Sequence, residues 1–282
     1  MDDLGVTMVQ IRENRYDAVI HMVTAADGAE DFYASQVEAR YESVDEAREK
    51  DELLRQAYMG HQRWILIGNR DCSDFQNKIQ NVKESVLDVL GYSAGAFFHK
   101  KFLLAKDKQA DNRVLPIDLS GIRDSSFEEI FVTETMIDYK TSEGEVIASS
   151  VEKRGGRQSF MYTLNVKLRM KGQVVQKKKS ISPTEYISYK QMVKKGTIPL
   201  KSKRVCIIDN GVYIIINYFT ELDGAPMLGI IQVRHGNQSK LQLPDYIKVY
   251  RDVTDEPQYM PDKMCKESYY MDPQDKAGTL TN

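Results

Sequence analysis

The fold is decided by the stretch at residues 150–179, which reads SVEKRGGRQSFMYTLNVKLRMKGQVVQKKK. Apolar and charged side chains alternate in its middle with the period of two that is typical of β-strands. Lys167 and Arg169 fall on one face of the predicted strand, and the apolar set falls on the other face: Tyr162, Leu164, Val166, Leu168 and Met170. Lys177 and Lys179 point the same way, with Lys178 opposed. Glycine-bearing turns separate these strands, which predicts β-hairpins.

Positive charge is concentrated around the same stretch. Residues 151–204 carry fifteen Lys and Arg but only two acids, Glu152 and Glu185, in a chain whose net charge is −2. A basic concentration of this kind is typical of a site for a polyanion. The alternative is a solvated outer face, on which lysines are common. The scarcity of interspersed acids speaks against it, because solvated faces usually mix both signs of charge.

Composition places the chain among ordinary globular proteins of one or two domains. Its cysteines, Cys72, Cys206 and Cys265, lie far apart, which excludes a disulfide framework and a zinc-ligand pattern. The start of the chain lacks the features of a signal peptide, and no apolar run is long enough to span a bilayer. We expect a cytoplasmic protein whose membrane contact, if it has one, is peripheral.

A change of sequence pattern divides the chain near residue 93. Residues 1–93 are acidic and predict an α/β segment, and residues 94–282 are basic and predict an antiparallel β series. The first part predicts strands at 16–25 and 64–67 and helices at 33–58 and 74–90, capped by Ser43 and Ser73. The second predicts strands at 102–104, 128–139, 145–153, 159–169, 173–180, 205–208, 212–218 and 228–234, a helix at 183–194 capped by Thr184, and irregular chain over 255–282.

Several stretches together resemble a known family. YDAVIHMVTAADGAEDFY (16–33) and GHQRWILIGN (60–69) resemble the later part of an AAA-type P-loop NTPase or nucleotide-kinase-like domain. SSVEKRGGRQSFMYTLNVK (149–167), KKKSISPTEYISY (177–189) and LKSKRVCIID (200–209) resemble a CYTH-like domain. In this order they resemble the TRPL-translocation-defect protein family. The resemblance implies an α+β chain, with a partial P-loop-NTPase-like domain over 1–93 and an antiparallel, triphosphate-tunnel type β-barrel over 94–282.

The function that this resemblance implies is that of a cytosolic trafficking factor that binds GTP and phosphoinositide. Its partners would be phosphoinositide headgroups or other polyphosphates and a membrane surface, with endomembranes as a place of peripheral association. The cargo is left open, whether a membrane protein or a tubulin-like cytoskeletal partner. Nucleic acid is not favoured, because Phe160 and Tyr162 fall on the strand face opposite Lys167 and cannot stack with bases there. The predicted phosphate-binding residues are Lys101, Lys153, Arg154, Lys167, Arg169, Lys177, Lys179, Lys203 and Arg204.

Two departures from the family pattern limit the expected chemistry. The first is the absence of a G-x-x-x-x-G-K-[ST] motif, which holds nucleotide phosphates and which the family carries upstream. We therefore expect a form that begins after the P-loop, with GTP or ATP and Mg²⁺ as cofactors only if a complete nucleotide domain exists. Arg40 and Arg48 match the arginine-bearing lid region of such kinases. The alternative for both is a surface position on an amphipathic helix.

The second departure concerns metal. Phe97 and His99 occupy the acidic positions of the E-x-E-x-K strand of triphosphate-tunnel enzymes, and Lys101 matches its lysine. A later acidic strand of those enzymes corresponds here to Ile230-Ile231-Gln232-Val233, which carries no carboxylate. Triphosphate hydrolysis needs a metal, so the sequence favours a polyphosphate-binding protein without catalytic or metal-ligating residues. The alternatives are a metal-dependent triphosphate-tunnel phosphohydrolase, or a nucleotide-binding NTPase if the missing N-terminus is supplied.

Overall fold

The structure is a computed structural model. It describes residues 11–13, 15–33, 41–70, 72–92, 97–105, 119, 127–156, 159–170, 172–209, 212–234 and 243–277. Among these residues, no helix combines the length and the apolar character needed to cross a membrane.

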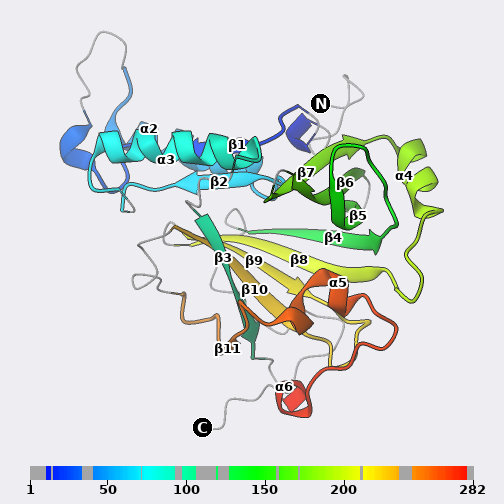
Figure 1. Cartoon of the computed structure of the whole chain (residues 1–282). Helices are drawn as coiled ribbons and strands as arrows, with labels where there is room; N and C mark the ends of the chain where they lie inside the picture. Colours follow the sequence, from blue (N-terminus) through cyan, green and yellow to red (C-terminus); the bar gives the residue numbers. More distant parts are fainter. Residues whose placement is uncertain are drawn as a thin grey trace.

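The N-terminal unit contains two parallel strands and two helices that lie along them (Figure 1). Strands β1 (Val19–Met22) and β2 (Trp64–Ile67) pair, a short 3-10 helix spans Glu30–Phe32, and the two helices are α2 (Val44–Tyr58) and α3 (Phe75–Val89). The helix predicted over 33–58 is confirmed only from Val44 onward, because Tyr33 and residues 41–43 are not helical. The predicted capping box of Ser43 and Glu46 is confirmed. The predicted cap at Ser73 is wrong, because Asp74 accepts the hydrogen bond from the amide of Asn77 at 2.8 Å.

The remaining strands form one antiparallel sheet of nine described strands. Its order is β11-β3-β10-β9-β8-β4-β5-β6-β7 (Figure 1). Their bounds are β3 (Phe97–Leu104), β4 (Phe127–Met136), β5 (Glu145–Gly155), β6 (Phe160–Met170), β7 (Gln173–Ile181), β8 (Leu200–Asp209), β9 (Val212–Tyr218), β10 (Met227–Arg234) and β11 (Val249–Asp252). The expected antiparallel series is confirmed, but the described strands form an open sheet in place of a closed barrel, with β11 and β7 as its edges.

Short helices accompany the sheet. Helix α4 (Pro183–Lys190) begins after Ser182, whose side chain forms a capping box with Glu185, so the predicted cap at Thr184 is wrong. Pro183 occupies the first helical position, where its missing N–H costs nothing. The C-terminal region, predicted to be irregular, contains a 3-10 turn (Pro257–Tyr259) and two short helices, α5 (Pro261–Met264) and α6 (Pro273–Ala277).

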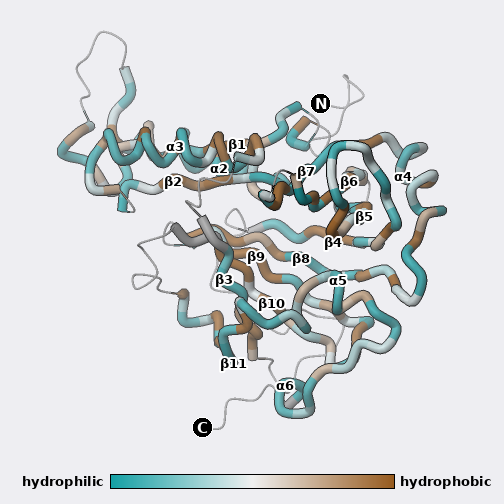
Figure 2. The backbone as a smooth tube through the Cα atoms, in the orientation of Figure 1, coloured by the Kyte–Doolittle hydropathy of each residue, from teal (hydrophilic) through white to brown (hydrophobic). Residues whose placement is uncertain are grey.

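The sheet has an outer and an inner face with different coverings. On the outer face, Leu164, Val166 and Leu168 pack with Tyr186 of α4, as expected for the apolar side of β6. We call the opposite face, which the N-terminal unit covers, the inner face. Figure 2 shows hydrophobic residues along β2 and along β8 to β10, whereas α2 and α3 alternate between hydrophobic and hydrophilic positions.

Two apolar layers occupy the two ends of the inner face. At one end, Met59 and Trp64 of the N-terminal unit pack on a strand set formed by Ile130, Val132, Cys206, Ile208, Tyr213 and Ile215. The rings of Trp64 and Tyr213 meet edge to face with centroids 4.7 Å apart. At the other end, Tyr259 and Met264 of the C-terminal segment pack on a strand set formed by Leu103, Met136, Leu200 and Leu228.

Candidate functional site

A polar layer lies between these two apolar layers of the inner face. On β4, Glu134 stands at an inward position between Val132 and Met136, which belong to the two apolar layers. On β8, Arg204 occupies the equivalent position between Leu200 and Cys206. Because alternate residues of a strand share a face, these charged side chains point into the space that the flanking residues enclose.

A cavity of about 100 Å³ opens in this polar layer. Its polar lining comes from Lys101, Glu134, Ser202, Arg204 and Asn217, and Tyr259, Pro261 and Met264 close it from the C-terminal side. Arg204 Nε donates to Asn217 Oδ1 at 2.8 Å, and Lys101 Nζ donates to the carbonyl oxygen of Tyr259 at 2.8 Å. Burial lowers the pKa of Lys101, so its charge is costly without an anion beside it.

Two carboxylates meet at the edge of this cavity. Glu134 and Glu152 are direct register partners on β4 and β5, and Ser150 Oγ donates to Glu134 Oε1 at 2.6 Å. Burial and the negative charge of Glu152 raise the pKa of Glu134. Burial also acts to raise the pKa of Glu152, but the charges of Arg204, Arg154 and Lys178 outweigh it, and that pKa is lowered. The pair therefore holds a proton more readily on Glu134 than on Glu152.

Further cationic side chains face the carboxylate pair from the far part of the sheet. Burial lowers the pKa of Lys178 on β7, and the charges of Arg63, Arg154 and Arg204 lower it further against the opposing pull of Glu152. His99 on β3 lies on the inner face with its side chain still in contact with solvent. The surrounding protein, followed by the charges of Lys178 and Lys101, lowers its pKa. Because β3 lies next to one edge of the strand order and β7 forms the other edge, the sheet must curl to bring these groups together.

Within the described chain, Asn165, a neighbour of Lys178, has an unsatisfied hydrogen-bond acceptor. Asn165, the register partner of Lys178, has a buried side-chain oxygen that accepts no hydrogen bond from the part of the chain that the structure describes. Unsatisfied buried polar groups are uncommon in native structures. Apart from Arg154, which is bonded to Glu13 and Gly60, the inner face thus has the cations Lys101, Lys178 and Arg204 around a carboxylate pair, with unused hydrogen-bonding capacity.

Of the nine predicted phosphate-binding residues, the structure brings only Lys101 and Arg204 into the cavity. Arg154 also points to the inner face, but it is buried and bonded to Glu13 and to the carbonyl oxygen of Gly60. The other six lie elsewhere: Lys153 over the ring of Phe160 at 3.8 Å, Lys167 exposed, and Arg169, Lys177, Lys179 and Lys203 in ion pairs with Glu145, Glu143, Glu185 and Glu129. Their role in binding stays a prediction.

Strand register explains this distribution. Lys177 and Lys179 are the partners of Val166 and Leu164, so they share the outer face with the apolar residues of β6. Lys178, opposed to them in the sequence pattern, is the residue that reaches the inner face. Lys178, Glu134 and Glu152 are not among the site residues predicted from the sequence. A signal was present in Glu134, an acid between the inward apolar residues Val132 and Met136.

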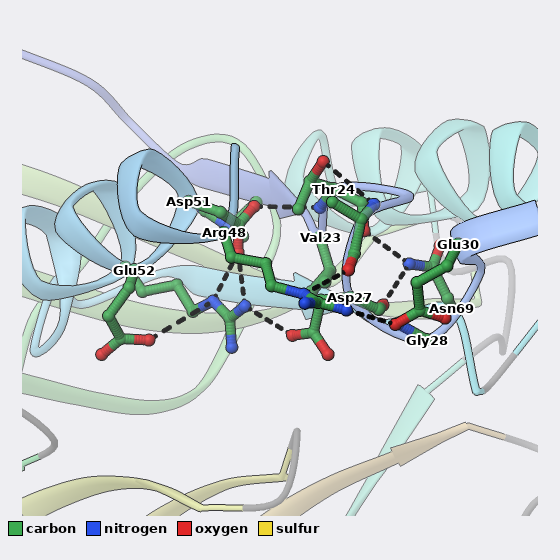
Figure 3. Close-up of polar contacts among 12 residues, drawn as sticks. Val23, Thr24, Asp27, Gly28, Glu30, Arg48, Asp51, Glu52 and Asn69 are labelled. Atoms are coloured by element: carbon green, nitrogen blue, oxygen red, sulfur yellow. Dashed lines mark hydrogen bonds and ion pairs between the residues drawn. The ribbon is translucent and has the colours of Figure 1, made fainter. Parts of the chain in front are cut away.

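A second polar cluster lies where β1 and β2 end (Figure 3). Arg48, predicted as a lid arginine, donates to the carbonyl oxygen of Ala26 at 2.6 Å and to Glu30 at 2.8 Å. Asp51 accepts from the amide of Thr24 at 2.9 Å and from Arg55 Nε at 2.6 Å. These groups satisfy one another, and Arg40 lies outside the described residues. The lid function of both arginines remains a prediction.

Comparisons with protein-family models and with curated proteins find no match. Among solved structures, the inorganic triphosphatase NE1496 is similar with a TM-score of 0.38 and 12% identity, over 60% of this chain and 93% of that one. A structure described as the hypothetical protein NE1496 gives 0.38 and 13%, over 60% and 97%. The protein PH1819 from Pyrococcus horikoshii OT3 gives 0.31 and 12%, over 49% and 77%. No comparison supports the AAA-type domain or the TRPL-translocation-defect family.

Proposed function

We propose that the protein binds the phosphate chain of a small polyphosphate in the inner cavity and cleaves it with the help of a divalent cation. The observation that carries this proposal is the convergence of Lys101, Lys178 and Arg204 on the register pair Glu134 and Glu152. Lysine and arginine are the side chains that bind phosphate oxygens most strongly, through charge-assisted hydrogen bonds.

The carboxylate pair fits a divalent cation that is shared with the substrate. No group of three or more potential metal ligands occurs among the described residues. Mg²⁺, however, is commonly bound by one or two carboxylates together with substrate phosphates. Glu134 and Glu152 suit this mode, because burial and the repulsion of Glu152 raise the pKa of Glu134, and a cation between the two carboxylates would relieve the repulsion. When bound, the cation would neutralise and orient the phosphates. The carboxylates missing at the β3 and β10 positions therefore have counterparts on β4 and β5.

The size of the cavity favours phosphate groups over a phosphoinositide headgroup. About 100 Å³ corresponds to roughly three waters at ~30 Å³ each, which suits one terminal phosphate group of a chain, with the rest of the chain outside the cavity, but not an inositol ring with its phosphates. The lysines that led to the phosphoinositide hypothesis lie on different faces and are mostly in ion pairs. Phosphoinositide binding, GTP binding and a trafficking function stay predictions that no contact described above favours.

Phosphate release from inorganic tripolyphosphate, measured with Mg²⁺ and with Mn²⁺, tests the proposal. We expect cation-dependent release by the wild-type protein and at least a roughly tenfold loss in Arg204→Gln, because hydrogen bonds to charged groups contribute about 1.5–3 kcal/mol. Glu134→Gln and Glu152→Gln should retain tripolyphosphate binding and lose the cation-dependent release of phosphate. The matched control is Lys203→Gln, which removes the adjacent cation on the outer face.

The outcomes separate the two parts of the proposal. Tripolyphosphate binding that Arg204→Gln weakens, without phosphate release under either cation, would retain the binding site and eliminate the cleavage. Equal binding by Arg204→Gln and wild-type protein, or an equal loss in Lys203→Gln, would contradict the inner cavity as the site.

A further inference from the structure

A second cationic cavity lies outside the inner face, and we call it the lysine groove. It has a volume of about 680 Å³ and is lined by four segments: residues 136–140 and 146–149, residues 194–197, and residues from α5 onward. Figure 1 shows α5 beside the ends of β4 and β8, where these segments meet. The lining contains two acids, Asp138 and Asp262, against five lysines: Lys140, Lys194, Lys195, Lys263 and Lys266.

Backbone hydrogen bonds fix the lysine-bearing segments to one another. The amide of Lys194 donates to the carbonyl oxygen of Met136 at 3.0 Å, next to an antiparallel bridge between Ile137 and Val193. The amide of Ile198 donates to the carbonyl oxygen of Cys265 at 2.7 Å, and a second bridge joins Thr197 and Lys266. The lysines therefore converge from distant parts of the sequence on a rigid frame.

Their positive charge is not balanced within the groove. Lys263 lies 3.6 Å from Asp262, whereas Lys140, Lys194, Lys195 and Lys266 form no ion pair with any residue that the structure describes. These side chains are exposed, and solvated lysine faces usually carry interspersed acids. An excess of one sign in a concave site attracts an oppositely charged ligand.

Helix α5 separates the lysine groove from the inner cavity. Pro261 and Met264 line the inner cavity, whereas Asp262, Lys263 and Cys265 line the groove. The two cavities also differ in size, at about 100 Å³ and about 680 Å³. A ligand as large as a phosphorylated ring can therefore enter the groove and not the inner cavity.

We propose that the lysine groove binds a soluble, multiply phosphorylated small molecule, at a site distinct from the inner cavity. Pockets of roughly 300–1,000 Å³ are typical of small-molecule sites, which matches the groove. Ammonium groups without carboxylate partners favour several phosphates on one ligand. Single-stranded nucleic acid is disfavoured, because Tyr139 is the one aromatic residue among the described lining and stacking needs successive aromatic platforms.

Titration calorimetry with inositol hexakisphosphate tests this proposal, because that probe is too large for the inner cavity. We expect one salt-sensitive binding event. Lys194→Glu combined with Lys266→Glu should weaken it about tenfold or more. The matched control is Lys83→Glu combined with Lys248→Glu, which reverses the same number of exposed lysines away from the groove and should leave binding unchanged. Phosphate release from tripolyphosphate by the groove variant should stay at the wild-type level, which separates this test from that of the inner cavity.

Three results would overturn the groove as a ligand site. The first is no binding of inositol hexakisphosphate by the wild-type protein. The second is an equal loss in the groove and control variants, which would indicate general attraction to positive charge. The third is binding to phosphatidylserine vesicles that Lys194→Glu with Lys266→Glu abolishes, without binding of the soluble probe, since the site would then be a membrane contact.

Discussion

At the scale of single residues, the inner polar layer depends on charged side chains that replace apolar ones at inward strand positions. Glu134 and Arg204 each stand where the alternation of their strand calls for a core residue. Buried charges are costly unless they are paired. Here the charges are only partly paired, because the register partner of the Glu134 carboxylate is a second carboxylate, Glu152. This is the arrangement expected where a ligand contributes the missing charges.

The cost of the carboxylate pair predicts how stability depends on pH. Glu134 has a raised pKa in the folded protein, so its ionisation favours unfolding, and the cost grows as pH rises from the ordinary value of 4.5 through the folded value. Glu134→Gln should therefore raise the free energy of unfolding near pH 7, and the gain should vanish near pH 4. Urea denaturation at both pH values measures this. A variant less stable than wild type near pH 7 would show that the charge of Glu134 stabilises the fold.

At the scale of helices and strands, the sequence predicts which segments are regular better than it predicts their ends. Strands β2 and β9 match their predicted bounds, and a glycine adjoins each of them, Gly68 after β2 and Gly211 before β9. The caps at Ser73 and Thr184 were each misplaced, because in both cases a neighbouring Asp or Ser can accept the same amide hydrogen bond. Local sequence does not decide between two such candidates.

Helix α4 offers a direct test of its cap. Ser182 Oγ accepts from the amide of Glu185 at 3.1 Å, and the carboxylate of Glu185 accepts from the amide of Ser182 at 2.7 Å. Ser182→Ala should therefore lower the free energy of unfolding by about 1 kcal/mol. Thr184→Ala should change it by less than about 0.5 kcal/mol. Denaturant titration of both variants measures the difference, and a larger loss in Thr184→Ala would restore Thr184 as the cap.

The candidate site was harder to predict than the strands, for a reason that lies in the sheet. The alternation of Lys177, Lys178 and Lys179 shows that the middle residue points the other way, but not which way is inward. That depends on the pairing of β7 with β6 and on the irregular register of β5 between Val146 and Ala148. Sequence alternation therefore predicts that faces exist, and long-range pairing decides which face encloses the cavity.

At the scale of the whole molecule, the two ends of the chain close the two ends of the inner face. The N-terminal unit is held there by polar contacts as well as by Met59 and Trp64. Arg12 pairs with Glu128 of β4, and Thr163 of β6 donates to Gln62 at 3.2 Å. The carbonyl oxygen of Gly60 accepts from Arg154, and a Cβ at Gly60 would collide with Glu128. The C-terminal segment reaches the opposite end through Tyr259 and Met264. The cavity is thus a property of the assembled chain.

This arrangement predicts that Trp64 stabilises the sheet as well as the N-terminal unit to which it belongs. Trp64 is 4% exposed and is the only tryptophan in the sequence, so its emission reports the packed layer. Trp64→Ala should cost about 3–5 kcal/mol, as large-to-small changes of buried aromatic residues do. Tyr41→Ala, at a side chain 91% exposed, is the control and should cost less than about 0.5 kcal/mol. In wild-type protein, Trp64 emission and far-ultraviolet circular dichroism should change at the same urea concentration. Emission that changes at a lower concentration, with little destabilisation by Trp64→Ala, would mean that the N-terminal unit rests on the inner face without closing it.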